Sequence, residues 1–187
     1  MPGVKYPVPG VLYVIGCASP HVLSIDVLIG KAQARGWDVC LVCTPTAAAW
    51  LAADLSRLEA ATGHPVRSHY KLPGEPDVLP PADAMIVAPA TSNTVSKWAL
   101  AISDTLALGL ITEAIGLRLP LVALPCLSAA QAAHPAFRCG VEVLRAAGVA
   151  VLLSPDGHTL PQPGAAAGAF PWDLALDELD RRRGHRP

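Results

Sequence analysis

Residues 89–94 read Pro-Ala-Thr-Ser-Asn-Thr and place three hydroxyls and one amide within six positions. They directly follow residues 84–88, whose Met-Ile-Val-Ala core predicts a strand that is buried on both faces. Capping one helix needs only one such side chain, so this density exceeds what a cap requires. The residues predicted to face a small ligand here are Pro89, Thr91, Ser92, Asn93 and Thr94.

A second group of small residues, Gly16, Cys17, Ala18 and Ser19, follows the apolar run of residues 11–15. Small side chains let a ligand approach the backbone, and the N–H groups of a helix start favour a phosphate. An ordinary turn with an N-cap is the alternative. The sequence contains neither G-x-G-x-x-G nor G-x-x-x-x-G-K-[ST], which argues against a dinucleotide and against ATP hydrolysis and leaves a mononucleotide phosphate.

Two further stretches of the chain offer polar groups to a ligand. Thr44 and Thr46 follow the next apolar run, where their hydroxyls suit the same phosphate or a polyol chain, although a helix cap explains them equally well. Asp104, preceded by Ser103, lies about three helical turns after Asn93. It is placed to reach a ligand or a neighbouring subunit, or else it is a solvated surface residue.

Apolar runs of strand length alternate with segments of helical periodicity along the chain, which predicts parallel strands joined by helical crossovers. The expected strands are residues 11–15, 39–43, 66–70, 84–88, 119–124 and 149–153. The expected helices include one from Asn93 or Thr94 to Leu106, a further piece at 108–117, an Ala-rich helix with Trp50 on its buried side, and a C-terminal helix at 171–183. Residues 72–81 contain four prolines and are expected to form an extended loop.

The predicted fold class is α/β, with a single doubly wound parallel sheet in a three-layer domain of the Rossmann/flavodoxin-like type. In such sheets ligands bind beyond the carboxyl ends of the strands, where the winding reverses, and the polar groups described above fall at those ends. The length of 187 residues and the mean hydropathy of +0.40 suit one core. We expect residues 1–155 to form the ligand-binding domain, and residues 156–187 to form a flexible segment and a C-terminal helix that packs on the same domain.

The charge pattern indicates the class of partner. The formal net charge is −1, and the only run of like charges is the three arginines at 181–183, so we expect neither nucleic acid nor an anionic membrane as a partner. Every apolar stretch is interrupted well before the ~20 residues that a bilayer span needs. The first ten residues lack the apolar region of a signal peptide, and we therefore expect a cytoplasmic protein.

The five cysteines are an odd number, which disfavours a disulfide framework and agrees with a reducing compartment. Cys40 and Cys43 have C-x-x-C spacing, but both lie in an expected strand. Their side chains are therefore expected to point to opposite faces, where they cannot grip one metal ion. We expect two buried core residues and no metal site.

Residues 89–94, with the Lys-Trp-Ala at 97–99 and the Ile-Ser-Asp-Thr-Leu at 102–106, resemble the P-A-S-A-N-T motif and following helix of the flavin-containing cysteine decarboxylases. That family includes phosphopantothenoylcysteine decarboxylase and the homo-oligomeric enzymes that oxidise the C-terminal cysteine of lantibiotic-type peptides. The resemblance covers residues 11–153 and implies FMN as the cofactor. It places the FMN phosphate near Gly16, Cys17, Ala18, Ser19 and Thr44, and it places residues 91–94 against the flavin.

Two departures from the family pattern affect catalysis. The family usually has a catalytic His some fourteen residues before the motif, and here that position is Glu75, with His69 six residues earlier. Either is a candidate base, although a Glu starts from a pKa of ~4.3 against ~6.5 for His and needs burial to act near neutrality. The second family motif, P-x-M-N-x-x-M-W, reads Pro-Cys-Leu-Ser-Ala-Ala-Gln-Ala at 125–132. Ser128 thus replaces the Asn expected to hold the substrate carboxylate.

The resemblance implies an enzyme that uses FMN to decarboxylate a cysteine oxidatively, giving an enethiol, with a cysteine-containing peptide or small molecule as substrate. The alternatives are a flavin-binding or assembly protein without activity, phosphopantothenoylcysteine decarboxylase, and a flavin prenyltransferase, whose G-A-S-G loop is not matched at residues 16–19. His21 is a further candidate contact to flavin or substrate. We expect a homo-oligomer, a trimer or a dodecamer, from the resemblance and from the apolar surface of residues 97–117.

Overall fold

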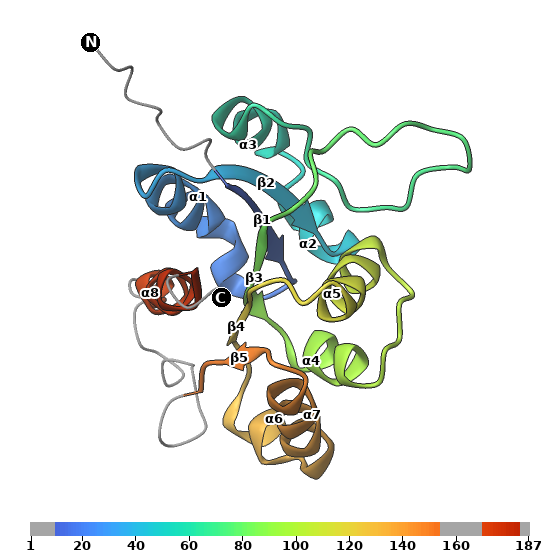
Figure 1. Cartoon of the computed structure of the whole chain (residues 1–187), viewed down its shortest axis with the longest axis vertical. Helices are drawn as coiled ribbons and strands as arrows, with labels where there is room; N and C mark the ends of the chain where they lie inside the picture. Colours follow the sequence, from blue (N-terminus) through green and yellow to red (C-terminus); the bar gives the residue numbers. More distant parts are fainter. Residues whose placement is uncertain (1–9, 154–169, 184–187) are drawn as a thin grey trace.

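The computed structural model describes residues 10–153 and 170–183, which form a parallel sheet covered by helices (Figure 1). Its strands are β1 (Val11–Gly16), β2 (Asp38–Cys43), β3 (Ala84–Ala90), β4 (Leu121–Pro125) and β5 (Ala150–Val151). They lie in the order β2-β1-β3-β4-β5, and every pair is parallel. This is the flavodoxin-like order, so the predicted doubly wound α/β fold is confirmed.

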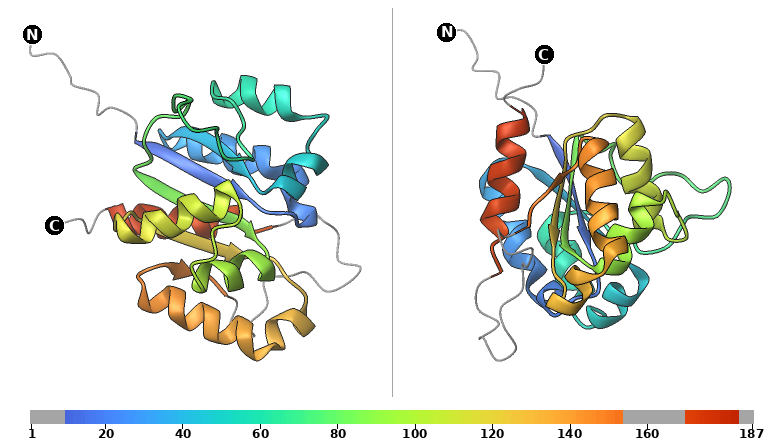
Figure 2. Two further views of the ribbon diagram at one scale, coloured as in Figure 1. Left: turned by 90° about the vertical axis from the view of Figure 1, so that its right-hand side faces the viewer. Right: turned by 90° about the horizontal axis from the view of Figure 1, so that it is seen from below.

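Helices cover both faces of the sheet and form the two outer layers (Figure 2). They are η1 (Pro20–Ser24, a 3-10 helix), α1 (Ile25–Ala34), α2 (Pro45–Trp50), α3 (Leu55–Thr62), α4 (Ser92–Ala99), α5 (Leu106–Gly116), α6 (Ala129–Ala133), α7 (Pro135–Ala146) and α8 (Trp172–Arg183). α1 and α8 pack on one face, and α4, α5 and α7 pack on the other. Within the described residues, none of these helices combines the length and the apolar character needed to cross a bilayer.

The strands form where the sequence is apolar, and their alternation divides the core in two. β3 is buried along its whole length, as expected for a central strand with helices on both sides. Cys40 packs with the cluster under α4, α5 and α7, whereas Cys43 packs with the cluster under α1 and α8. The prediction that these two cysteines point to opposite faces is therefore confirmed.

The predicted C-terminal helix is confirmed as α8, which ion pairs fasten to α1. The Lys31 ammonium lies 2.7 Å from the Asp173 carboxylate, and the Arg35 guanidinium lies 2.8 Å from both Asp177 and Asp180. The apolar side of α8 joins the same core cluster as α1. Residues 154–169 lie outside the described residues, so the predicted boundary at 155 stays a prediction.

The helix predicted from residue 93 to residue 106 is wrong, because the structure divides it. α4 ends at Ala99, Ala101 takes a left-handed φ of 56°, and α5 starts only at Leu106 after the N-cap Thr105. All of residues 100–104 are exposed. Without a buried face, tertiary packing does not stabilise this stretch as helix, although its periodicity permits one.

Three smaller predictions also need correction. Residues 66–70 form no strand and pair with β2 only through an isolated bridge at Arg67. The last strand is shorter than predicted, because only Ala150 and Val151 pair with β4. The Ala-rich helix is interrupted between α2 and α3, and Trp50 is 49% exposed rather than buried, because α2 ends there before its face can turn into the core.

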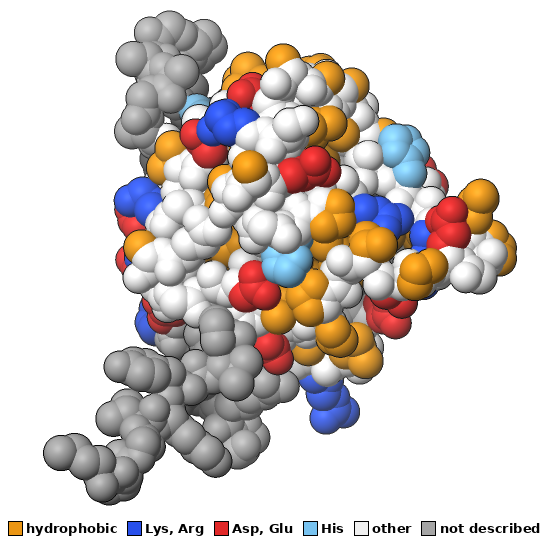
Figure 3. All heavy atoms as spheres, turned by 90° about the horizontal axis from the view of Figure 1, so that it is seen from above, with side chains coloured by type: hydrophobic (Ala, Val, Ile, Leu, Met, Phe, Trp, Pro, Cys, Tyr) orange, Lys and Arg blue, Asp and Glu red, His pale blue; other side chains and the backbone are white. Residues whose placement is uncertain are grey.

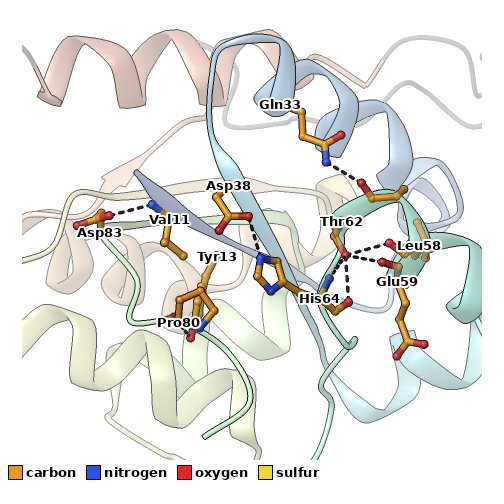
Figure 4. Close-up of polar contacts among 11 residues, drawn as sticks. Val11, Tyr13, Gln33, Asp38, Leu58, Glu59, Thr62, His64, Pro80 and Asp83 are labelled. Carbon is orange, nitrogen blue, oxygen red and sulfur yellow. Dashed lines mark hydrogen bonds and ion pairs between the residues drawn. The ribbon is translucent and has the colours of Figure 1, made fainter. Parts of the chain in front are cut away.

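The segment between α3 and β3 is fastened at both ends and projects between them (Figure 1). The polar contacts that hold its ends and α3 in place appear in Figure 4. His64 Nε2 lies 2.8 Å from the Asp38 carboxylate, and the Tyr13 hydroxyl donates a 2.8 Å hydrogen bond to the Pro80 carbonyl. Residues 71–78 are all exposed and irregular, which confirms the predicted loop.

Candidate functional site

The strand order places a crevice between the carboxyl ends of β1 and β3. β2 lies on one side of β1 and β3 on the other, so the chain leaves these two strands in opposite directions and the connections diverge. Backbone hydrogen bonds tie the ends together, since Cys17 N–H donates to the Pro89 carbonyl at 3.2 Å and Cys126 N–H donates to the Ala90 carbonyl at 2.8 Å. These bonds hold the residues that follow β1 and β4 against the end of β3, so that together they form one rim.

A cavity of about 580 Å³ opens at this rim, within the size range of small-molecule sites. The left view of Figure 2 shows η1, α2 and α6 at the same end of the sheet. The cavity is lined by Ala18, Ser19, Pro20, Thr44, Pro45, Thr46, Thr91, Ser92, Asn93, Thr94, Lys97, Thr105, Leu108, Cys126, Leu127, Ser128 and Gln131. Most of the predicted cofactor residues are thus brought together in one place.

The motif after β3 both starts α4 and lines the cavity. Thr91 is the N-cap, and its hydroxyl oxygen accepts the Thr94 N–H at 3.3 Å and lies 3.0 Å from the Thr94 hydroxyl. Thr94 is almost fully buried, whereas Asn93 is exposed at the cavity. The helix cap thus uses the side chains of Thr91 and Thr94. Ser92 and Asn93 take no part in this cap, in line with the prediction that the motif holds more polar side chains than a cap requires.

Gly16, the last residue of β1, and Cys17, which follows it, do not line the cavity. A Cβ at Gly16 would lie 3.2 Å from a methyl carbon of Val22, so glycine here lets η1 pack closely against β1. The Cys17 thiol is fully buried, and its burial raises its pKa, against a smaller lowering by hydrogen bonds from Thr94 and Thr91. Pro89 is also buried and absent from the lining. Gly16, Cys17 and Pro89 are therefore predicted cofactor residues that pack beneath the lining instead of forming it.

Ser19 and Cys126 meet on the cavity wall. The Ser19 hydroxyl donates a 2.8 Å hydrogen bond to the Cys126 sulfur. Burial raises the pKa of the Cys126 thiol, and the bond from Ser19 only partly opposes this. Cys126 therefore presents a neutral thiol to the cavity.

Ser128, at the position of the family's Asn, lines the cavity at the start of α6. Its hydroxyl oxygen accepts the Gln131 N–H at 3.2 Å, while Gln131 Oε1 accepts the Ser128 N–H at 3.1 Å. This reciprocal capping box holds both side chains at the cavity wall. The pair offers a hydroxyl and an amide in the region where the family pattern has one amide.

Lys97 is the only charged side chain in the lining, as far as the described residues go. It lies one helical turn after Asn93 on α4, and its ammonium group pairs with the carboxylate of Asp104. Asp104 itself does not line the cavity, and Ser103 beside it accepts a hydrogen bond at its carbonyl from the Tyr70 hydroxyl at 3.0 Å. The structure thus makes Asp104 the partner of Lys97 outside the cavity lining, and it joins Ser103 to the projecting segment through Tyr70.

Neither candidate base lines the cavity of its own chain. Glu75 is exposed, and its carboxylate accepts the Leu72 N–H at 2.8 Å within a local turn. His69 is also exposed, with Nδ1 2.9 Å from the Ser68 hydroxyl.

His21 is buried against Phe170, with ring centroids 4.7 Å apart, and its burial lowers its pKa. It does not line the cavity either.

Sequence reasoning missed several lining residues. Lys97 follows Asn93 by four positions and Gln131 follows Ser128 by three, so helical spacing could have found both. Thr105 and Leu108 reach the cavity only because the chain breaks after α4 and turns back into α5. No signal in the sequence marked that turn.

Solved structures with the same fold include SpaF, an FMN-dependent cysteine decarboxylase, with a TM-score of 0.70, 21% identity, and coverage of 93% of this chain and 97% of that one. MrsD from a Bacillus species has a TM-score of 0.71, 19% identity, and coverage of 93% and 96%. The coenzyme A biosynthesis bifunctional protein CoaBC of Thermococcus kodakarensis is 34% identical over 99 residues, 49% of this chain and only 24% of that protein's length. A family model described as Flavoprotein matches residues 11–182, which confirms the resemblance and the flavin cofactor expected from the motif at 89–94: the chain belongs to the Flavoprotein family.

Proposed function

We propose that the chain binds FMN in the cavity between the ends of β1 and β3 and uses it to decarboxylate the C-terminal cysteine of a peptide oxidatively. The observation that carries this proposal is the cavity itself. It lies at the reversal point of a flavodoxin-like sheet and is lined by the polar residues of the motif at 91–94.

The donor set of the cavity fits FMN. Ser19, Thr44 and Thr46 supply hydroxyl groups at the ends of β1 and β2, where a phosphate finds hydrogen-bond donors. Among the described residues, no Asp or Glu lines the cavity, so the phosphate dianion meets no carboxylate on its wall. Leu108 and Leu127 add apolar surface suited to a ring system.

In this proposal the protein chiefly binds and orients its substrate. FMN, when bound, supplies the oxidising chemistry by accepting two electrons and a proton from the thiol-bearing carbon and sulfur of the cysteine. Ser128 and Gln131 would hold the peptide carboxylate through hydrogen bonds. CO2 then leaves readily because the negative charge left on the substrate delocalises onto the thiocarbonyl sulfur.

The proton of the substrate thiol must pass to a base, for which we retain Glu75 and His69. Both lie on the exposed segment that projects from the body of the molecule in the right view of Figure 2. Hydrophobic side chains gather on and beside this projection on the face drawn in Figure 3. We therefore propose that a neighbouring copy in a trimer or dodecamer brings its projecting segment to the cavity.

Phosphopantothenoylcysteine is the second candidate substrate, because the curated relative CoaBC belongs to coenzyme A biosynthesis. It carries the same cysteine carboxylate on a smaller molecule. A flavin-binding role without decarboxylation is the remaining alternative, since the expected catalytic His and substrate Asn are both replaced.

The test is to purify the chain, record its flavin absorbance, and incubate it with a cysteine-terminated peptide. The expected result is a yellow protein and a product that has lost CO2 and two hydrogens by mass. A serine-terminated peptide is the matched control, and phosphopantothenoylcysteine tests the second candidate. A yellow protein that leaves both thiol substrates unchanged supports the non-catalytic alternative.

Asn93→Ala tests whether this cavity holds the flavin. It should release FMN, whereas Ser96→Ala, one turn along α4 and outside the lining, should retain it. A colourless wild-type protein that takes up no added FMN would overturn the proposal as a whole.

A further inference from the structure

We propose that Lys97 and Asp104 act as an opposed pair of charges that sets the reduction potential of the bound flavin. Lys97 favours reduction of the ring and Asp104 restrains it. The inference rests on the proposed function, because it assigns a role toward FMN in the same cavity. It assigns both residues an electrostatic effect on the flavin ring, and it assigns neither residue a step in which a bond forms or breaks.

The first support is the distribution of charge around the cavity. Within the part of the chain that the structure describes, Lys97 is the single charged residue that lines the cavity. Its counter-ion Asp104 lies outside the lining, so of the two paired residues only Lys97 belongs to the cavity wall. The Lys97 side chain is 31% exposed, so the ion pair with Asp104 does not enclose it in the protein interior.

The second support is the position of Lys97 relative to the groups that suit a phosphate. The hydroxyls of Ser19, Thr44 and Thr46 stand at the ends of β1 and β2. Lys97 instead shares the wall formed by α4 and α5 with the apolar side chain of Leu108. A phosphate held at the strand ends leaves this mixed cationic and apolar wall to the ring.

The third support is the charge balance of flavin reduction. The oxidised ring is neutral, and uptake of two electrons and one proton from the thiol substrate leaves one negative charge on it. A fixed cation nearby stabilises that charge, and a nearby carboxylate destabilises it, because charges around a flavin tune its electronics. Both effects are stronger at a protein wall than in bulk water, because the effective dielectric constant is lower there.

The test measures the reduction potential of the FMN-loaded protein by reductive titration against a reference dye. Lys97→Gln should shift the potential to more negative values, and Asp104→Asn should shift it to more positive values. Lys97→Arg should keep the wild-type value because it keeps the charge. The affinity for sulfite, whose adduct with oxidised flavin is anionic, should fall several-fold in Lys97→Gln and rise in Asp104→Asn.

The matched control is the Lys31–Asp173 pair between α1 and α8, which has a 2.7 Å ion pair and lies outside the cavity lining. Lys31→Gln and Asp173→Asn make the same changes in net charge and should leave the potential unchanged. If the ion pair at Lys97 were only structural, both of its variants would weaken FMN binding in the same direction, and the inference would be wrong.

Two further results would also overturn it. One is an unchanged potential with weaker binding of oxidised FMN in Lys97→Gln, which would assign Lys97 to the phosphate. The other is an unchanged reduction potential in Asp104→Asn. This result would overturn the inference even if Lys97→Gln lost its flavin and its potential could not be measured. A wild-type protein that binds no FMN would instead contradict the proposed function.

Discussion

The hydroxyl of Ser19 donates a 2.8 Å hydrogen bond to the thiol of Cys126, and this bond spans the end of β3. Ser19 follows β1 and Cys126 follows β4, and β3 lies between these two strands. The thiol is a weak acceptor, so the single proton of the Ser19 hydroxyl can exchange this bond for one to a stronger acceptor such as a phosphate. The bond holds the Ser19 side chain at the cavity wall before any ligand arrives, and the proton turns from Cys126 to the ligand on binding.

We predict that Ser19→Ala weakens FMN binding about 10- to 100-fold, the loss expected for one hydrogen bond to a charged phosphate. Fluorescence titration of the apoprotein with FMN measures the dissociation constant. Ser24→Ala is the matched control, because its hydroxyl donates to the His21 carbonyl at 3.1 Å and does not line the cavity. Equal affinities for both variants would remove Ser19 from the phosphate site.

Glu75→Gln should reduce turnover of a cysteine-terminated peptide by about 10²- to 10⁴-fold, the usual cost of losing a general base, while FMN stays bound. His69→Asn tests the rival base with a side chain of similar size. Product mass and flavin absorbance separate the loss of chemistry from the loss of cofactor. Full activity in both variants would show that neither residue is the base.

A mixed assembly tests whether the base comes from a neighbouring copy. Co-expression of Glu75→Gln chains with Asn93→Ala chains should restore part of the activity, because an intact cavity in one chain can meet an intact Glu75 from another. If cavity and base belonged to the same chain, each site would carry one defect and the mixture would stay inactive. Light scattering that reports a monomer would contradict the arrangement directly.

Gly109→Ala should release the projecting segment with little change in global stability. A Cβ at Gly109 would lie 2.2 Å from the Tyr70 hydroxyl oxygen, so Tyr70 must move and lose its hydrogen bond to Ser103. That loss of about 1 kcal/mol is offset by the similar gain in helix propensity. Limited proteolysis of residues 66–83 should accelerate, while Gly116→Ala in the same helix, where a Cβ meets nothing within 4 Å, should leave it unchanged.

The free energy of unfolding should fall as the pH rises above about 9. Burial raises the pKa of Cys43 from 9.0 to about 12, so between these values the unfolded chain loses a proton that the folded protein keeps. Stability is therefore present below the unfolded pKa and declines through the folded one, by about 1.4 kcal/mol per pH unit for each such group. Burial also raises the pKa of Tyr13 to about 12 from 10.0, which adds to the decline at higher pH.

Cys43→Ala should make this decline shallower in urea unfolding experiments between pH 9 and pH 11, whatever its effect on stability at neutral pH. Cys139→Ala, at an exposed cysteine, is the matched control and should leave the slope as in the wild type. A slope that does not respond to Cys43→Ala would mean that its thiol is not desolvated as the structure indicates.

The sequence alone determined the class of fold and most of one wall of the cavity. Apolar runs such as residues 84–88 predict buried strands because no polar face is available, and polar side chains directly after them fall at the carboxyl ends of a parallel sheet. Thr91, Ser92, Asn93 and Thr94 were therefore located by short-range pattern. Counting along the chain likewise showed that Glu75 and Ser128 stand at the positions where the family pattern has its catalytic His and its substrate-binding Asn.

Only the tertiary structure decided which side chains meet. The break after Ala99 depends on the absence of a buried face at residues 100–104, and this break is what brings Thr105 and Leu108 to the cavity and Asp104 to Lys97. The same holds for Ser19 and Cys126, which are 107 positions apart and meet because β3 inserts between β1 and β4. Local periodicity favours an element, but whether the element forms and what it contacts depend on burial summed over the whole fold, which no single segment of sequence contains.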